Sequence, residues 1–208
     1  MSPFPTRFGV PPEVQLFFRP FYHTDAIGNL VFSYGNVIEH FGFAFHKVPV
    51  AGQLWMAGNL NLHMVSDVFL AGSAMDAIAF LTLRRNWLKK ADNILFVSVG
   101  TLPQGSQLQW IRSNLGHKKL HLLFDRELLG KIIDLKIAAG LHGWPMEVTV
   151  TGNRVTVNFR NALYTLDTGG FSLHAFEKAA GYRFTVRTHK SNMAATFIDH
   201  LMTMTFNH

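Results

Sequence analysis

The sequence predicts an α/β fold whose sheet is mainly parallel and flanked by helices. Between residues 65 and 150, short runs that are apolar on both faces alternate with segments of helical periodicity, and strands buried on both faces are typical of parallel sheets. On either side the pattern changes to alternating apolar and polar residues, which indicates antiparallel strands. We therefore expect one compact unit with a β-rich lead-in (1–64), an α/β core (65–150) and an extension with a β-hairpin and a closing helix (151–208).

The lead-in is rich in glycine, proline and aromatic residues, and turn residues separate its short apolar pieces. The pieces at 29–34 and 41–45 are strand candidates, and residues 25–28 carry the turn chemistry that precedes the first of them. We expect these strands to pack on the core that follows.

The core reads as three strands, each followed by a helix. Ser106 is a suitable N-cap for the second helix, and Gly116 is suited to end it. Crossovers between parallel strands should be right-handed. The predicted strands are 65–70, 94–99 and 120–124, and the predicted helices are 74–88, 106–115 and 128–141.

The extension begins with a strong hairpin signal, because alternating runs at 147–151 and 154–159 flank a Gly152-Asn153 turn. Beyond it we expect a short helix at 172–180, a strand at 182–187 and an amphipathic helix at 193–204.

Composition narrows the class of protein. The 208 residues include no cysteine, so disulfide frameworks and thiolate metal sites are excluded. No apolar run reaches the roughly 18 residues that span a bilayer, and the N-terminus does not resemble a signal peptide, so we expect no membrane association and a cytoplasmic location. The net charge of +6 is compatible with an anionic partner, although many basic proteins bind no nucleic acid.

Two carboxylates follow the third predicted core strand. Ligands of parallel sheets bind where strands end and helices begin, and Asp125 and Glu127 lie at that position. Two residues apart on an extended backbone, their side chains would point the same way and could hold Mg²⁺ together with water. The alternative is that these acids only favour the N-terminus of the helix that follows.

Residues 65–80 and 118–130 together resemble the two signature motifs of the Toprim domain, the magnesium-binding fold of primases, topoisomerases and related nucleases. The matching residues are Gly72, Asp76, Asp125, Glu127 and Gly130. The resemblance implies that Asp125 and Glu127 bring the metal. It also implies a weakened site, because Ala71 stands where the family has its acid/base glutamate, and Glu127 replaces an aspartate.

The flanks are similar to Toprim segments in primase and mobilisation proteins of bacterial mobile elements. An aromatic, glycine-rich lead-in and the element at 196–201 carry this narrower resemblance. It implies work in replication or mobilisation of DNA.

Basic residues gather near the end of the chain. On a strand at 182–187, Arg183 and Arg187 would share one face, with Tyr182 and Phe184 on the other and Lys190 just beyond. Basic and aromatic groups so interleaved can bind the phosphates and bases of single-stranded DNA. The alternative is ordinary solubilising charge.

Three hypotheses follow from these patterns. The first is a non-catalytic component of a DNA-processing system that binds nucleic acid or nucleotide and holds Mg²⁺ weakly. The second is a metal-dependent phosphotransferase, primase-like or nuclease-like, that uses Asp125 and Glu127 with an acid recruited from Asp67, Asp76 or a partner chain. The third is a structural interaction protein that retains the fold for packing. The oligomeric state is open.

Overall fold

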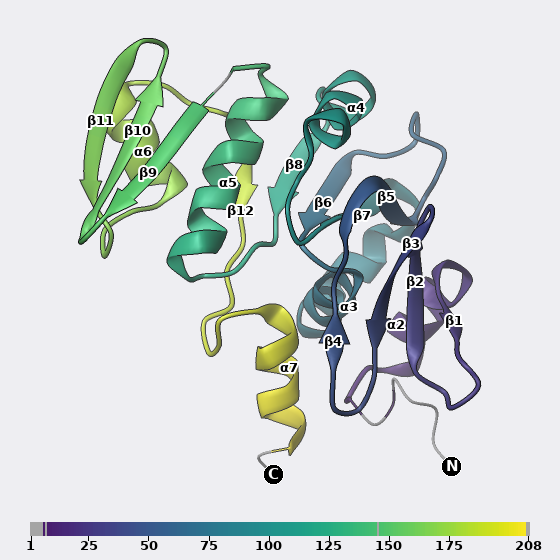
Figure 1. Ribbon diagram of the computed structural model, residues 1–208. Helices are drawn as coiled ribbons and strands as arrows, with labels where there is room; N and C mark the ends of the chain where they lie inside the picture. Colours follow the sequence, from purple (N-terminus) through teal and green to yellow (C-terminus); the bar gives the residue numbers. More distant parts are fainter. Residues whose placement is uncertain (1–5, 7, 145, 207–208) are drawn as a thin grey trace.

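The computed structural model describes residue 6 and residues 8–144 and 146–206, and its strands form three sheets (Figure 1). The central sheet has the order β12-β8-β6-β7-β5. Its members β12, β8, β6 and β7 run parallel, and β5 is antiparallel to β7 at the edge. The prediction of a mainly parallel sheet is therefore confirmed. The bounds are β5 (Val50–Gly58), β6 (Asp67–Ala71), β7 (Ile94–Gly100), β8 (Lys119–Leu122) and β12 (Arg187–Thr188).

Helices cover both faces of the central sheet, as the doubly apolar strands require. Along β6, Phe69 and Ala71 face the core that contains α3 (Ala74–Leu83), whereas Val68 and Leu70 face α4 (Gly105–Leu115) and α5 (Leu128–Leu141). Every residue of β6 and β7 is buried. Because these strands are buried on both faces, most of their residues are apolar, and this made the strands of the core predictable from the sequence.

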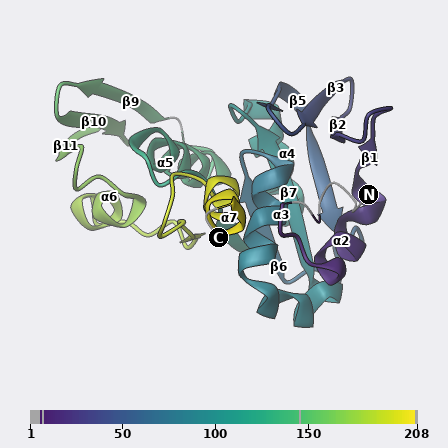
Figure 2. The ribbon, with the colours of Figure 1, turned by 90° about the horizontal axis from the view of Figure 1, so that it is seen from below.

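The N-terminal elements form a second layer over the α3 side of the sheet (Figure 2). Phe8, Phe18, Phe32, Tyr34 and Phe41 all belong to the core shared with α3. The elements are α2 (Pro12–Phe18), the short 3₁₀ helix η1 (Arg19–Phe21), and an antiparallel sheet of β1 (His23–Thr24), β2 (Leu30–Tyr34), β3 (Val37–Phe41) and β4 (His46–Lys47).

Two features of the lead-in differ from the prediction. Residues 12–18 form a helix that was not expected, with Pro12 at its first turn, where a missing backbone N–H costs nothing. In addition, β5 does not join the N-terminal sheet but extends the central one, so the lead-in of 1–64 shares a sheet with the core. The piece at 41–45 is strand only at Phe41.

The C-terminal extension contains a three-stranded antiparallel sheet covered by a helix. The hairpin of β9 (Met146–Thr151) and β10 (Arg154–Phe159) is confirmed, with Thr151 opposite Arg154 across the turn. A further strand that the sequence pattern did not predict, β11 (Ala162–Asp167), pairs with β10. The helix is α6 (Leu173–Ala180), and α5 lies between this sheet and the central one (Figure 1), burying apolar residues against both.

Several expected elements are shorter than predicted. The helix at 74–88 ends at Leu83, and Arg84, with a ψ angle of 49°, leads into the 3₁₀ helix η2 (Arg85–Asn93). The strand at 182–187 is reduced to the start of β12, because Thr185 adopts a φ of 58°. The closing helix α7 (Phe197–Phe206) packs against α3. Among the described residues, no helix is long and apolar enough to cross a membrane.

Candidate functional site

A cleft of about 280 Å³ lies where β6 and β8 end. Because these strands are parallel neighbours, the segments after them meet at one edge of the sheet. Gly72 and Asp76 line the cleft from the first segment, and Asp125 and Gly130 line it from the second. The structure thus brings together these four residues of the two sequence motifs. The start of α7 adds Asp199, a carboxylate that the sequence analysis did not single out as a site residue.

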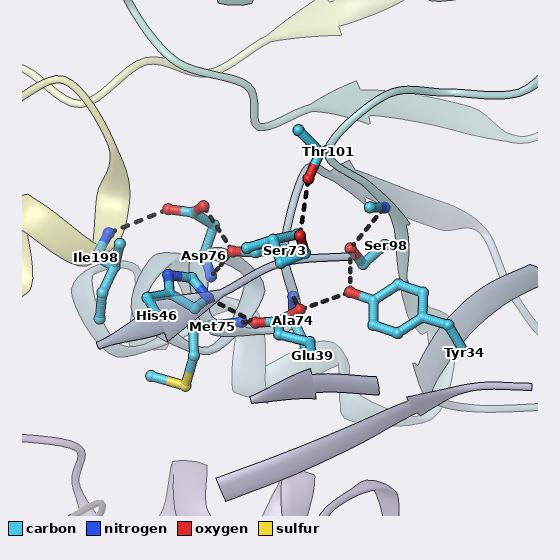
Figure 3. A network of polar contacts seen from close by, with 12 residues as sticks. Tyr34, Glu39, His46, Ser73, Ala74, Met75, Asp76, Ser98, Thr101 and Ile198 are labelled. Atoms are coloured by element: carbon cyan, nitrogen blue, oxygen red, sulfur yellow. Dashed lines mark hydrogen bonds and ion pairs between the residues drawn. The ribbon is translucent and has the colours of Figure 1, made fainter. Parts of the chain in front are cut away.

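Asp76 connects the two helices that border the cleft (Figure 3). Its Oδ1 accepts hydrogen bonds from the backbone N–H groups of Phe197 and Ile198, each at 3.1 Å, at the first turn of α7. Its Oδ2 accepts the Ser73 hydroxyl at 2.7 Å, and Ser73 in turn caps α3 through the Asp76 N–H. These contacts make Asp76 a structural link between α3 and α7.

Burial raises the pKa of the Asp76 carboxyl to about 6, against the lowering effect of its hydrogen bonds from Ser73 and Ile198, and the nearby Asp125 adds to the rise. A carboxyl that titrates near neutrality has a pKa suited to general acid/base chemistry. However, three donors already occupy its oxygens. Proton transfer by Asp76 would therefore compete with the cap that holds α7.

Position 71, where the Toprim family has glutamate, cannot contribute to the cleft chemistry. The methyl group of Ala71 is fully buried and belongs to the core on the α3 side of the sheet. It offers neither a lone pair nor a proton. No residue of β6 lines the cleft.

A buried glutamate from another element reaches the start of α3. Glu39 on β3 has no exposed surface, and its carboxylate accepts the N–H groups of Ala74 (2.7 Å) and Met75 (3.1 Å) (Figure 3). The Tyr34 hydroxyl (2.6 Å) and His46 Nε2 (2.9 Å) complete four contacts. Two of these four contacts cap α3, and His46, which this carboxylate holds, lines the cleft.

Strand alternation is the sequence signal that points to Glu39. Strand alternation puts it on the same face as Val37 and Phe41, of which Phe41 is in the core. A charge at such a position must find partners when it is buried.

Asp125 and Glu127 do not point into the cleft together, and this expectation was wrong. Strand β8 ends at Leu122, so the extended backbone that would align two alternate side chains does not reach them. The chain bends at Arg126 and Glu127 to begin α5, where Glu127 is the exposed N-cap residue outside the cleft lining.

The Asp125 carboxyl is half-buried. Burial raises its pKa, the Lys190 cation opposes the rise, and the carboxylates of Asp199 and Glu127 add to it. Among the described residues, no three histidine, aspartate or glutamate side chains gather closely enough to hold a metal ion. The donor set suits at most one hard cation that keeps most of its water, because Asp76, the third carboxylate of the cleft besides Asp125 and Asp199, is already held by the backbone of α7.

Lys190 is held inside the protein. Its amine pairs with Asp134 Oδ2 at 2.6 Å and donates to the carbonyl oxygens of Phe124 and Asp125, each at 2.9 Å. These contacts attach the start of the last segment to the loop that carries Asp125. A phosphate-binding role for Lys190 stays a prediction, and it would require the amine to leave these partners.

Arg183 and Arg187 do not share a strand face, so that expectation was also wrong. With Thr185 at positive φ, Phe184 turns into the core of the three-stranded sheet. Arg183 lines a hollow beside α6, whereas Arg187 is exposed on β12 at the edge of the central sheet.

Beside β12 lies a hydrogen-bonded chain of an aspartate and two histidines. Asp67 Oδ1 is 3.0 Å from His121 Nε2, and His121 Nδ1 is 2.8 Å from His189 Nε2. Asp67 lies at the beginning of β6, opposite the cleft, so it cannot supply the acid that the phosphotransferase hypothesis would recruit there. Burial lowers the pKa of His189 to about 4, and His121, Arg84 and Arg187 add to the decrease.

Comparison of the chain with protein-family models, with curated proteins and with solved structures found no match. The functional conclusion therefore depends on the residues themselves.

Proposed function

We propose that the protein is a non-catalytic, nucleic-acid-binding component of a DNA-processing system, built on a Toprim-like core whose metal site is degenerate. The observation that carries the proposal is the separation of charge on the two sides of α7. Carboxylates line the cleft at the ends of β6 and β8, whereas the cations Arg84 and Arg187, which both act on His189, lie on the other side.

The basic side is not neutralised within the chain. Neither Arg84 nor Arg187 forms an ion pair with a carboxylate of the described residues, although both act on His189 strongly enough to lower its pKa. Unpaired cations on the same side of the protein attract anions, and an anion with several charges can interact with both. A nucleic-acid backbone presents such charges at regular spacing.

The acidic cleft supports weak metal binding without turnover. Ala71 supplies no acid, Asp76 is committed to the cap of α7, and Glu127 lies outside the cleft. A magnesium ion held by Asp125, with Asp199 nearby, would retain most of its water. Such an ion can screen the cleft, and Ala71 leaves it without the acid/base glutamate of the Toprim family.

Fluorescence anisotropy with a labelled single-stranded oligonucleotide at several salt concentrations tests the proposal. Binding should weaken with salt, with a log–log slope of about −0.7 for each phosphate contacted. Arg187→Ala should weaken binding to unrelated sequences to the same extent and flatten the log–log slope by about 0.7, the value for one phosphate contact. The matched control is Arg154→Ala, which removes an exposed arginine from β10 on the three-stranded sheet. Absence of binding even near ~20 mM salt, where phosphate contacts are strongest, would favour the structural interaction protein instead.

The phosphotransferase hypothesis makes a different prediction for the same protein. Purified protein with Mn²⁺ should neither cleave phosphodiesters nor extend primers if the site is degenerate. Turnover that disappears in Asp125→Ala would replace the non-catalytic proposal by the enzymatic one.

A further inference from the structure

A pocket of about 250 Å³ lies between the end of α3, the segment 190–193 and α7. None of the residues that line it is an aspartate or glutamate, and three of them are Arg84, Lys190 and His200. Asp199 neighbours His200 in sequence but lines the acidic cleft instead. The two hollows thus have opposite charge, with α7 between them.

The hydrogen bonds of Ser191 determine which nitrogen of His200 carries the proton. Ser191 Oγ accepts the backbone N–H groups of Met193 (3.3 Å) and Ala194 (3.1 Å), and it lies 3.2 Å from His200 Nδ1. Because two donors occupy the lone pairs of the hydroxyl oxygen, its hydrogen must point to Nδ1. The neutral ring therefore carries its own hydrogen on Nε2.

The Nε2–H group of His200 faces the pocket without an acceptor. His200 as a whole is only 8% exposed, and the described residues offer no hydrogen-bond partner to Nε2. If Nε2 were fully buried, it would be a buried nitrogen without a hydrogen-bond partner. Among the described side chains, however, the fully buried nitrogen or oxygen atom without a partner is Oδ1 of Asp134. Nε2 must therefore have some solvent access, and His200 lines the pocket beside it.

Arg84 supplies a second set of donors at the same place. It ends α3, its side chain is exposed, and it acts on His200 closely enough to add to the lowering of the pKa that burial causes. Its guanidinium has no carboxylate partner among the described residues. A guanidinium can bind two oxygens of one phosphate, which an imidazole N–H can complement through a third.

We propose that this pocket binds one backbone phosphate of single-stranded nucleic acid, with Arg84 and the Nε2–H of His200 as its donors. This inference rests on the proposed function and names the phosphate contact within it. Met193 and Met204, 59% and 46% exposed, border the same pocket and offer apolar surface to the adjoining base. The combination of phosphate donors and apolar rim suits a nucleotide unit better than a free inorganic anion.

The first experiment compares two neighbouring arginines by anisotropy with labelled oligothymidine. Arg84→Ala should weaken binding about fivefold to tenfold at low salt and flatten the salt slope by about 0.7, the value for one phosphate on a single strand. Arg85→Ala is the matched control, because Arg85 is 3.4 Å from Glu13 and does not line the pocket. Arg85→Ala should change affinity less than twofold. Equal effects of the two variants would overturn the assignment of a phosphate to this pocket but would leave the proposal of nucleic-acid binding intact.

The second experiment uses NMR of the histidine side chains with thymidine 5′-monophosphate and with inorganic phosphate as separate probes. The free protein should show His200 protonated at Nε2, and the nucleotide should shift that nitrogen at lower concentration than inorganic phosphate. Arg84→Ala should abolish the shift. A free protein with His200 protonated at Nδ1, or no shift with either probe, would overturn the inference. A shift with inorganic phosphate in a protein that binds no oligonucleotide would overturn both the inference and the proposed function.

Discussion

Replacing Glu39 by glutamine should cost about 3 kcal/mol of unfolding free energy. The carboxylate accepts four donors, two of which are the Ala74 and Met75 N–H groups at the N-terminus of α3. In glutamine one of the two oxygens becomes an NH₂ group, so at least one buried donor faces another donor. A buried donor without an acceptor costs about 1–3 kcal/mol, and loss of a buried negative charge at a helix N-terminus adds up to about 2 kcal/mol.

Urea denaturation followed by circular dichroism measures this effect. With an m-value of about 2 kcal/mol per molar urea, the midpoint should fall by about 1.5 M with no change in m. The matched control is Glu147→Gln on the exposed surface of β9, which should stay within about 0.5 kcal/mol of the wild type. If the two variants are equally stable, Glu39 does not hold α3 as described.

Three further changes test the loops and the buried ion pair. A Cβ at Gly130 would overlap the backbone oxygen and nitrogen of Asp125, so Gly130→Ala should lower the free energy of unfolding by about 3 kcal/mol or more. The control is Gly170→Ala, which should be nearly neutral because the space around Gly170 is open. Similar urea midpoints for the two variants would contradict this. A Cβ at Gly72 meets only ordinary contacts, the nearest at 3.7 Å, so Gly72→Ala should cost less than about 1 kcal/mol, and a loss as large as at Gly130 would contradict it. Burial raises the pKa of Asp134 from 3.8 to about 6, so the folded protein binds the proton of this carboxyl more tightly than the unfolded chain does. The resulting contribution to the free energy of unfolding is complete below pH 3.8 and is lost as the pH rises through 6. Relative to Asp134→Asn, the wild type should therefore lose about 3 kcal/mol between pH 4 and pH 7.5, as measured by urea midpoints, and a constant difference would refute the assignment.

The parallel core could be predicted because its strands are apolar on both faces and its helices have clear ends. The helix at 128–141 has the predicted bounds, and the hairpin turn at Gly152 and Asn153 fixed the register of β9 and β10. These features depend on neighbours in sequence, so the sequence displays them directly.

The features that could not be predicted depend on contacts between residues that are far apart in the sequence. His121 and His189 meet only because β12 returns to pair with β8, 66 residues later in the register. The alternation of residues 182–187 predicted a strand. In the structure, Phe184 packs in the core of the three-stranded sheet, and the backbone at Thr185 has a positive φ that interrupts the strand. The basic pocket likewise joins α3 to α7, and no local pattern links Arg84 with His200.

An NMR titration of the ¹⁵N-labelled protein with oligothymidine tests the central claim most directly, because it maps the bound strand onto the two sides of α7. The account predicts perturbed amides at 187–193 and at the pocket-facing residues of α7, with little change at 147–167 on the three-stranded sheet. Perturbations confined to the acidic cleft at 125–130, or no perturbation at low salt, would contradict it.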